Sequence, residues 1–325
     1  MVRIGMVGAG QQGKLYLAQF PVNEKVSMVG VHTSNETLKD EYFVENQINF
    51  FDNYNDLLQQ CDALILTADA KQVFVLATQA IRQGKHILLV SPIHISMEES
   101  AELLKFSREG NVKCMIGGTE RFNAAWLQVK SSIKNPMFIE GHRLAKFNHD
   151  EATNSVIEDL MFKDIDLVLH IVKSEIKRIS ATGMAVLSKK IDIANARLEF
   201  SNGCIANLTA SRISLKDMNK LRVFQKNGYH SIDFLAGKTD FISVKEKASI
   251  EKFKDANLTL KEYQQKIIDI ESTKNEQNRM IENEIEAFIQ CILLNTNPSI
   301  SLQDHYLSQE TANHIQRKIN YHDDK

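Results

Sequence analysis

The sequence lacks several features that would assign it to a special class. Its four cysteines, Cys61, Cys114, Cys204 and Cys291, lie far apart and show neither metal-ligand nor disulfide-frame spacing. No apolar run approaches the roughly 18 residues that a membrane span needs, and the N-terminal segment has no cleavage site typical of a signal peptide. We therefore expect reduced core cysteines, no metal site, no membrane association and a cytoplasmic location.

An excess of charge of one sign is also missing. The 325 residues carry a formal net charge of −2, which gives no electrostatic reason to expect nucleic acid or an anionic membrane as a partner. Hydrophobic residues make up 43% of the chain and charged residues 25%. This balance is typical of a globular protein, and the length suffices for two domains.

The first 120 residues alternate short apolar runs with helical patterns. The apolar runs lie at 2–7, 26–31, 63–66, 86–90 and 112–116. Short buried strands that alternate with helices predict a parallel sheet covered on both faces. Residues 1–120 are therefore predicted to form an α/β domain with a doubly wound parallel sheet, the Rossmann arrangement.

After about residue 120 the pattern changes to one helix followed by successive strands. The helix is expected at 157–173, and the alternating strand Ile193–Phe200 turns back into the strand Cys204–Ile213. Further strands are expected at 219–225, 229–236 and 239–245, and helices near 277–294 and 303–319, while 246–276 stays unassigned. Residues 121–325 are thus predicted to form an α+β domain with an open, mostly antiparallel sheet.

A glycine-rich motif follows the first predicted strand and opens the first predicted helix. Gly8, Gly10 and Gly13 fit the pattern G-x-G-x-x-G in the context that makes it specific for dinucleotides. The first glycine permits a tight turn, the second lets the backbone approach a pyrophosphate, and the third lets the helix pack on the strand. Free N–H groups at Gln11, Gln12 and Gly13 would hold the phosphates. The alternative is a glycine-rich turn without a ligand.

Thr33 and Ser34 stand where such a site usually carries an acidic residue, about 20 residues past the loop. Hydroxyl groups can bond the adenosine ribose, but less strongly than a carboxylate does. A site without the acid would also not repel a 2′-phosphate. NAD and NADP are therefore both candidate cofactors.

The domain order, the glycine loop and several later segments resemble the Gfo/Idh/MocA family of oxidoreductases over nearly the whole chain. The segments Glu120–Asn123, Gly141–Leu144 and Asp159–Asp166 are similar to its UDP-N-acetylglucosamine 3-dehydrogenase-like branch. The resemblance implies hydride transfer between a nicotinamide and a carbinol of a sugar, nucleotide sugar or similar polyol. It also implies a homodimer or homotetramer built through the sheet of the second domain.

The active-site residues that the resemblance implies are partly replaced. Ser91 precedes Pro92 where the family has a lysine near the nicotinamide, and Ala68-Asp69 stands in place of a Thr-Pro pair. Asp159 keeps the aspartate of a D-x-x-x-H pattern, whose histidine position is Lys163. The candidate catalytic residues are therefore Asp159, Lys163 and Ser91, with Pro92 beside the cofactor.

Lys163 is a poor replacement for a histidine base. Oxidation of an alcohol needs a base, and a lysine serves only if its pKa falls toward neutral. Asp159, one turn away, favours the charged ammonium, so we expect Lys163 to orient or bind an anionic group. Without the family, the helix has a simpler interpretation as a solvated stripe. That stripe would contain Asp159, Lys163, Asp166 and His170.

Arg121, Asn123 and His142 are the candidate substrate-binding residues. In the resemblance Arg121 borders the substrate cleft, where a guanidinium can fork onto a phosphate or carboxylate. The alternative for Arg121 is an ion pair with Glu120 or another acid. For His142, on a predicted strand, an outward-facing position is the favoured alternative.

Two hypotheses follow. The first is an NAD(P)-dependent oxidoreductase on a sugar-like carbinol with an atypical active site, supported by the glycine loop, Pro92 and Asp159. The alternative is a catalytically degenerate relative that binds a dinucleotide, a sugar ligand or a partner subunit without hydride transfer. Ser91, Lys163 and Thr33 favour the alternative, whereas fold and family favour the oxidoreductase.

Overall fold

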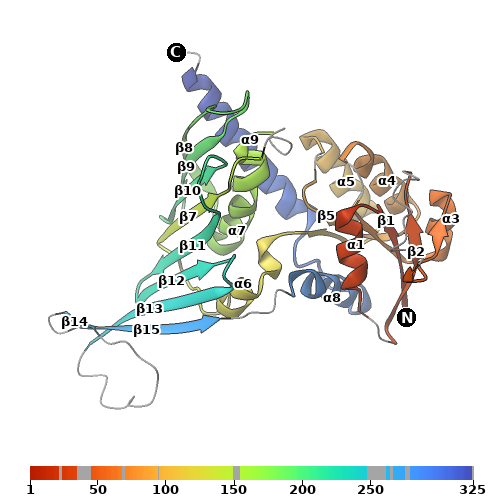
Figure 1. Ribbon diagram of the computed structural model, residues 1–325, viewed down its shortest axis with the longest axis horizontal. Helices are drawn as coiled ribbons and strands as arrows, with labels where there is room; N and C mark the ends of the chain where they lie inside the picture. Colours follow the sequence, from red (N-terminus) through yellow and green to blue (C-terminus); the bar gives the residue numbers. More distant parts are fainter. Residues whose placement is uncertain are drawn as a thin grey trace. The chain divides into compact units, whose positions relative to one another are not determined.

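The computed structural model describes residues 1–21, 24–34, 45–67, 70–93, 95–148, 154–246, 261–263, 266–274 and 279–323. The chain divides into two compact units (Figure 1). The first joins Met1–Phe122 to Arg279–Leu307, and the second joins Asn123–Asn278 to Ser308–Lys325. The segment Arg279–Leu307, expected in the second domain, therefore belongs to the first unit.

The first unit is built on a six-stranded sheet in the order β3-β2-β1-β4-β5-β6. All five neighbouring pairs are parallel, which confirms the predicted doubly wound sheet. The strands are β1 (Val2–Val7), β2 (Val26–His32), β3 (Phe50–Phe51), β4 (Ala63–Leu66), β5 (His86–Val90) and β6 (Cys114–Gly117). Every residue of β4 and β6 is buried, because helices cover both faces of a parallel sheet.

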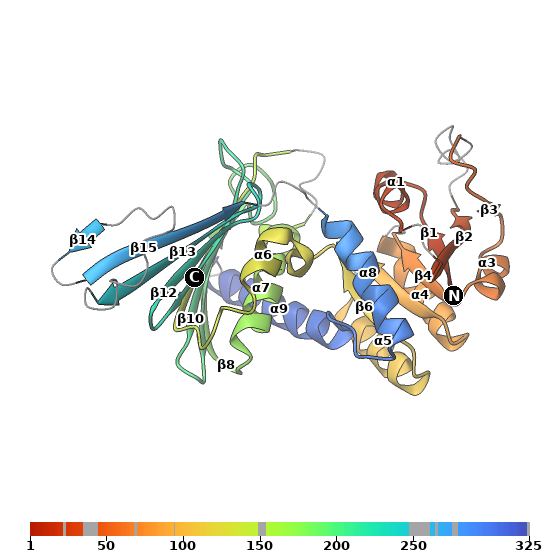
Figure 2. The ribbon, with the colours of Figure 1, turned by 90° about the horizontal axis from the view of Figure 1, so that it is seen from below.

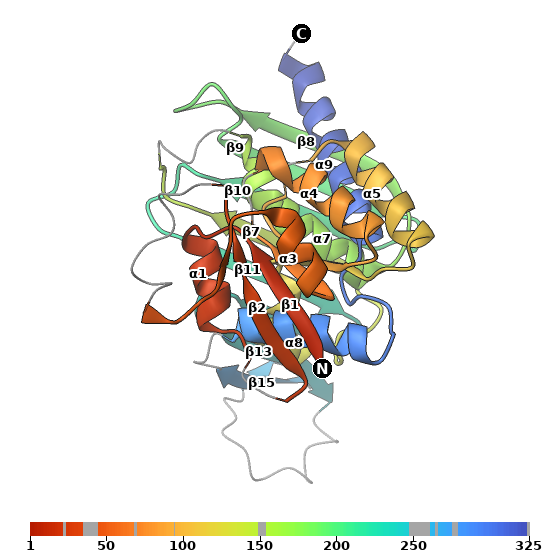
Figure 3. The same ribbon diagram turned by 90° about the vertical axis from the view of Figure 1, so that its right-hand side faces the viewer.

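Two groups of helices cover this sheet (Figures 2 and 3). One face carries α3 (Tyr54–Gln60), α4 (Ala70–Arg82) and α5 (Met97–Glu109), and the other carries α1 (Gln11–Ala18) and α8 (Met280–Leu293). Helix α8 adds Ile285, Phe288 and Ile289 to the core. Its apolar residues need a partner, and the core of the first unit supplies it.

The second unit is built on a nine-stranded sheet in the order β14-β15-β13-β12-β11-β7-β10-β9-β8. Its strands are β7 (Phe138–Leu144), β8 (Ile176–Met184), β9 (Ile193–Phe200), β10 (Ile205–Ser211), β11 (Met218–Gln225), β12 (Gly228–Asp233), β13 (Lys238–Glu246), β14 (Lys261–Tyr263) and β15 (Lys266–Lys274). The predicted mostly antiparallel sheet is confirmed, and β7 with β10 is the parallel pair. Strands β14 and β15 lie in the segment that the pattern left unassigned.

Helices cover one face of this second sheet (Figure 2). They are α6 (Ala124–Val129), a π-helical turn at Ile157–Met161, α7 (Phe162–Val172) and the part of α9 (Leu302–Asp323) that belongs to this unit. Arg143 on β7 anchors α7, because its Nε lies 3.1 Å and its Nη2 lies 2.7 Å from the carboxylate oxygens of the buried Asp164. Such a two-pronged contact fixes orientation as well as position.

In the part of the chain that the structure describes, no helix is both long and apolar enough to cross a membrane. All four cysteines are buried and free. The same residues contain no group of three or more His, Cys, Asp or Glu side chains placed to hold a metal ion.

Candidate functional site

The glycine loop lies where the strand order of the parallel sheet reverses, between β1 and β4. Gly8 has a φ of +108°, and a Cβ there would approach Thr67 Oγ1 to 2.6 Å. Gly13 brings α1 against the end of β1, since its Cβ would lie 2.2 Å from the Gly8 carbonyl oxygen. Both positions therefore require glycine for the turn and for the close packing of helix on strand.

Gly10 differs from these two glycines. Its φ is −69°, which any residue can adopt, and a Cβ there would meet nothing within 4 Å. Gly10 is the N-cap of α1, and its helix start has no side-chain cap. The uncapped N–H groups of Gln11, Gln12 and Gly13 therefore begin a helix with open space in front of Gly10, which fits a dinucleotide diphosphate.

The end of β5 is tied to the glycine loop by Gln12. The side-chain Nε2 of Gln12 donates to the Ser91 carbonyl oxygen at 3.0 Å, and Ser91 N donates to the Gly117 carbonyl oxygen at 3.0 Å. Pro92 follows through a cis peptide bond and is exposed. The first unit thus brings the predicted residues Gln12 and Ser91 into direct contact.

Thr33 and Ser34 follow β2 at the other side of the loop. Thr33 is buried, whereas Ser34 is exposed and its Oγ donates to Gln72 Oε1 at 3.4 Å. The predicted pair Ala68-Asp69 lies outside the described residues.

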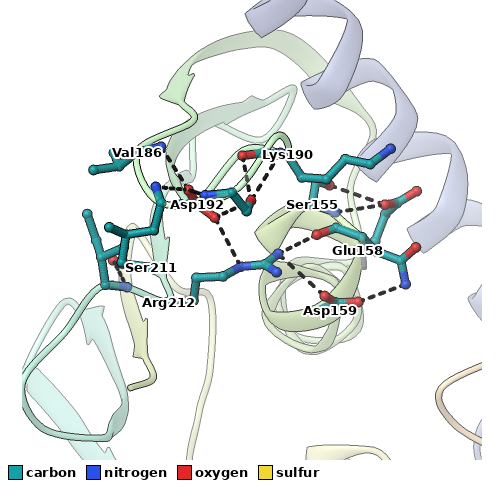
Figure 4. A network of polar contacts seen from close by, with 12 residues as sticks. Ser155, Glu158, Asp159, Val186, Lys190, Asp192, Ser211 and Arg212 are labelled. Carbon is teal, nitrogen blue, oxygen red and sulfur yellow. Dashed lines mark hydrogen bonds and ion pairs between the residues drawn. The ribbon is translucent and has the colours of Figure 1, made fainter. Parts of the chain in front are cut away.

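In the second unit, Asp159 lies inside the π-helical turn Ile157–Met161 and is held by two side chains (Figure 4). Asn154 Nδ2 donates to Asp159 Oδ1 at 3.2 Å, and Arg212 Nη2 lies 3.4 Å from Asp159 Oδ2. Both carboxylate oxygens therefore have fixed donors. Arg212, which directly follows β10, also donates to the carbonyl oxygen of Asn154, three residues before the turn, at 2.5 Å. π-helical turns occur often at functional sites.

Arg212 is itself held by a second carboxylate, Asp192 (Figure 4). Arg212 Nε lies 3.7 Å from Asp192 Oδ1, and the side chain of Asp192 is fully buried. The backbone N–H groups of Val186, Leu187 and Ser188 donate to Asp192 Oδ2 at 2.7 to 2.8 Å. Burial by itself would raise the pKa of Asp192, but these hydrogen bonds and the Ser188 hydroxyl lower it to about 2.

The low pKa of Asp192 predicts an acid-sensitive second unit. The folded-state pKa of about 2 lies below the ordinary value of 3.8, so the stabilisation, about 2 kcal/mol, is complete above pH 4 and is lost as the pH falls towards 2. The single tryptophan, Trp126, is buried in this unit and reports its unfolding by fluorescence. Denaturant midpoints of Asp192→Asn should fall less steeply over this range than those of the wild type. Asp217→Asn removes an exposed carboxylate and should keep the wild-type dependence of the midpoint on pH. The same dependence in Asp192→Asn as in the wild type would contradict the low pKa of Asp192.

Arg212, Asp192 and Asn154 were not among the candidates from the sequence. Asn154 and Asp159 are five positions apart, but Arg212 is 53 positions from Asp159, and no local pattern pairs those two. Lys163 lies half-buried at the start of α7, one turn beyond Asp159. The predicted proximity of Asp159 and Lys163 along one helix therefore comes with a third charged group that the sequence did not indicate.

The three predicted substrate-binding residues have contacts within their own units. Arg121 is buried, and its Nη2 lies 3.6 Å from Asp304 Oδ1, which favours the ion-pair interpretation. Asn123 caps α6 by accepting from Ala125 N at 3.0 Å. His142 lies 3.5 Å from Glu140. Because the neighbouring residue on β7 binds α7, His142 points to the opposite face of the sheet, the outward position that the sequence favoured.

Comparison with known families decides the relationship. Residues 2–118 match the model of an oxidoreductase family with an NAD-binding Rossmann fold, Gfo/Idh/MocA. Residues 125–231 match the C-terminal domain of the same family. The chain belongs to the Gfo/Idh/MocA family. The first unit therefore carries the NAD-binding domain of this oxidoreductase family.

Individual relatives include several sugar and polyol dehydrogenases. UDP-N-acetylglucosamine 3-dehydrogenase from Acidithiobacillus ferrooxidans is 29% identical over 72% of this chain and 74% of its own. The NAD⁺-dependent scyllo-inositol 2-dehydrogenase of Bacillus subtilis is 24% identical over 47% of this chain and 49% of its own. The solved structure of the Acidithiobacillus enzyme has a TM-score of 0.86, covers 98% of this chain and 97% of its own at 24% identity, and shows the fold alone.

Proposed function

We propose that this protein is an NAD(P)-dependent oxidoreductase that acts on a carbinol of a nucleotide sugar or of a similar sugar or polyol. The observation that carries this proposal is the dinucleotide loop, which keeps its three glycines with the geometry that a diphosphate requires. The substrate class rests on the relative named UDP-N-acetylglucosamine 3-dehydrogenase, 29% identical over 72% of the chain.

Different residues of the chain bind different parts of the cofactor. The N–H groups of Gln11, Gln12 and Gly13 bind the diphosphate in front of Gly10. Thr33 and Ser34 bond the adenosine ribose, and Ser91 and Pro92 border the nicotinamide. A bound nicotinamide supplies the acceptor for the hydride of the carbinol carbon, while the hydroxyl proton leaves to a base and the alcohol becomes a ketone.

Asp159 and Lys163 are proposed to position the substrate. The oxygens of Asp159 accept from Asn154 and pair with Arg212, which supports an orienting role. Lys163 carries a positive charge on the same helix and suits an anionic group such as the diphosphate of a nucleotide sugar. Ser91 contributes a hydroxyl where the family has a lysine.

A specific observation favours a second candidate function. The carboxylate of Asp159 already accepts from Asn154 and pairs with Arg212, and Ser91 and Lys163 stand where the family has a lysine and a histidine base. A protein that binds the dinucleotide or a sugar without hydride transfer would have the same arrangement.

Titration with NADH and NADPH, followed by a turnover screen on UDP-sugars and polyols, separates the two functions. Reduction of NAD⁺ or NADP⁺ by one of these alcohols, retained cofactor binding and lost turnover in Lys163→Met would support the oxidoreductase. Cofactor binding with no turnover on any carbinol would support the second candidate. No binding of either dinucleotide would contradict the oxidoreductase and would leave only sugar binding for the second candidate.

We propose that the ribose site accepts either NAD or NADP, because neither Thr33 nor Ser34 carries a negative charge. Ser34→Asp places a carboxylate at the exposed position. This carboxylate should weaken NADPH binding by about tenfold or more relative to NADH, since like charges repel near the surface. Ser34→Asn has the same size without the charge and should leave the ratio of the two dissociation constants close to the wild-type value. An unchanged ratio in Ser34→Asp would place the ribose elsewhere.

We also propose a homodimer or homotetramer through the uncovered face of the nine-stranded sheet. This face presents a half-buried aromatic group, in which the rings of Phe138 and Phe224 lie 5.7 Å apart and those of Phe224 and Tyr229 lie 4.7 Å apart. Aromatic side chains are enriched where protein interfaces form.

A further inference from the structure

Glu284 on α8 is a fully buried carboxylate in the first unit. Its Oε1 accepts from the hydroxyl of Tyr16 on α1 at 2.5 Å, and its Oε2 accepts from the backbone N–H of Gly118 at 2.6 Å. A buried charge is costly unless fixed donors compensate it, and here both oxygens have one. Burial, and then the neighbouring Glu284 charge, raise the pKa of Tyr16 above its usual range, so the phenol stays protonated and acts as the donor.

The end of β6 is shaped around this carboxylate. A Cβ on Gly117 would come within 1.9 Å of Glu284 Oε1, so the carboxylate occupies space that only a glycine leaves. Gly118 has a φ of +70°, and its Cβ would lie 2.9 Å from the Ser91 carbonyl oxygen. Glu284 therefore holds the turn after β6 directly against Ser91.

These contacts close into a ring. Glu284 holds Gly118, Ser91 N donates to the adjacent Gly117 carbonyl oxygen, and the Ser91 carbonyl oxygen accepts from Gln12. Gln12 and Tyr16 are four positions apart on α1, on the same side of the helix. Helix α1 thus contacts this chain of hydrogen bonds at two points, through Tyr16 at Glu284 and through Gln12 at Ser91.

We propose that Glu284 and Tyr16 are positioning residues for the cofactor, which set the distance between the glycine loop and the Ser91 turn. This inference rests on the proposed function, in which the diphosphate lies at the loop and the nicotinamide at Ser91. A dinucleotide has to contact the glycine loop and the Ser91 turn at once, so its affinity depends on the distance between them. A ligand that ends before the nicotinamide depends on the loop alone.

The test compares NADH with ADP-ribose, which has the diphosphate and both riboses but no nicotinamide. Dissociation constants are measured by calorimetry for the wild type, Tyr16→Phe, Glu284→Gln and the double variant. Each single variant should weaken NADH about tenfold and ADP-ribose less than twofold. The double variant should lose no more than about the larger single loss, because the residues act as one unit.

Tyr54→Phe is the matched control. Tyr54 is another buried tyrosine of the first unit. Its hydroxyl donates to the Leu76 carbonyl oxygen at 2.8 Å and takes no part in the contacts that join Glu284 to Ser91. It should leave the ratio of the NADH and ADP-ribose constants unchanged even if the melting temperature falls. Tyr16→Phe removes a single oxygen and keeps the test valid if Glu284→Gln does not fold.

Equal losses for both ligands in Tyr16→Phe, or no loss for either, would overturn the positioning role while the proposed function stands. If the wild-type protein binds neither ADP-ribose nor NADH nor NADPH, the proposed function fails and the positioning role fails with it.

Discussion

Replacing Gly10 by aspartate is expected to weaken NADH binding about 100-fold or more while the protein stays folded. A side chain at this position meets nothing within 4 Å, and aspartate is a favoured N-cap at the observed extended backbone angles. The helix start should therefore be as stable as in the wild type. The carboxylate, however, lies where the diphosphate binds and repels it. Fluorescence titration with NADH and thermal unfolding monitored by circular dichroism measure the two effects.

Two variants separate the causes. Gly10→Asn has nearly the same shape as aspartate without the charge, so it should weaken NADH less than Gly10→Asp. Gly13→Ala puts a methyl group 2.2 Å from the Gly8 carbonyl oxygen and should destabilise the fold by about 1 to 3 kcal/mol, as overpacking does. If Gly10→Asp binds NADH as tightly as the wild type, the diphosphate does not lie at this helix.

Arg212→Met should lower the free energy of unfolding of the second unit by about 2 to 3 kcal/mol. The substitution keeps much of the side-chain volume but leaves Asp192 fully buried without its cation, and it frees the start of the π-helical turn. Asp192 keeps its backbone donors and the Ser188 hydroxyl, so the expected loss is that of the buried ion pair and of the hydrogen bond to Asn154. Denaturant unfolding followed by Trp126 fluorescence reports this unit alone.

The control removes a cation from an exposed ion pair of the same sheet. Lys238 Nζ lies 3.0 Å from Asp240, and the lysine side chain is 46% exposed. Lys238→Met should cost less than about 1 kcal/mol, because solvent screens exposed pairs. Similar midpoints for Arg212→Met and Lys238→Met would show that Arg212 is not the buried link between Asp159 and Asp192.

The Arg212→Met variant also tests the proposed function. Asp159 keeps Asn154 as a partner in this variant, so cofactor binding in the first unit should be unaffected. A loss of turnover with unchanged NADH affinity would support a substrate-positioning role of Asp159. A parallel loss of NADH affinity would contradict that separation of roles.

Local patterns were sufficient for most of the architecture. The apolar runs that end at Val7, Leu66 and Val90 are the buried parallel strands β1, β4 and β5. The alternation in Ile193–Phe200 predicted a strand with one buried face, and that face carries Ala194, Ala196, Leu198 and Phe200. These patterns work because side-chain period and chain spacing depend on a few neighbouring residues.

Local patterns did not predict those features for which two different packing arrangements fit the same residues. Helix α8 has the amphipathic pattern of a surface helix, but nothing in its own residues says which core receives it. Strands β14 and β15 lie in a charged segment, where the pairing of β15 with β13 and of β14 with β15 decides the conformation. Arg121 fitted a substrate anion as well as an ion pair until Asp304 was found beside it.

Most of the strands and helices, and the glycine loop, follow from the amino-acid sequence, because a turn, a close approach and a helix start each depend on residues a few positions apart. Which charged side chains meet depends on how the elements pack in the folded chain. Glu284 and Tyr16 are 268 positions apart and Arg212 and Asp159 are 53 apart, and such partners are chosen by the packing of whole helices and strands, which leaves no trace in local spacing.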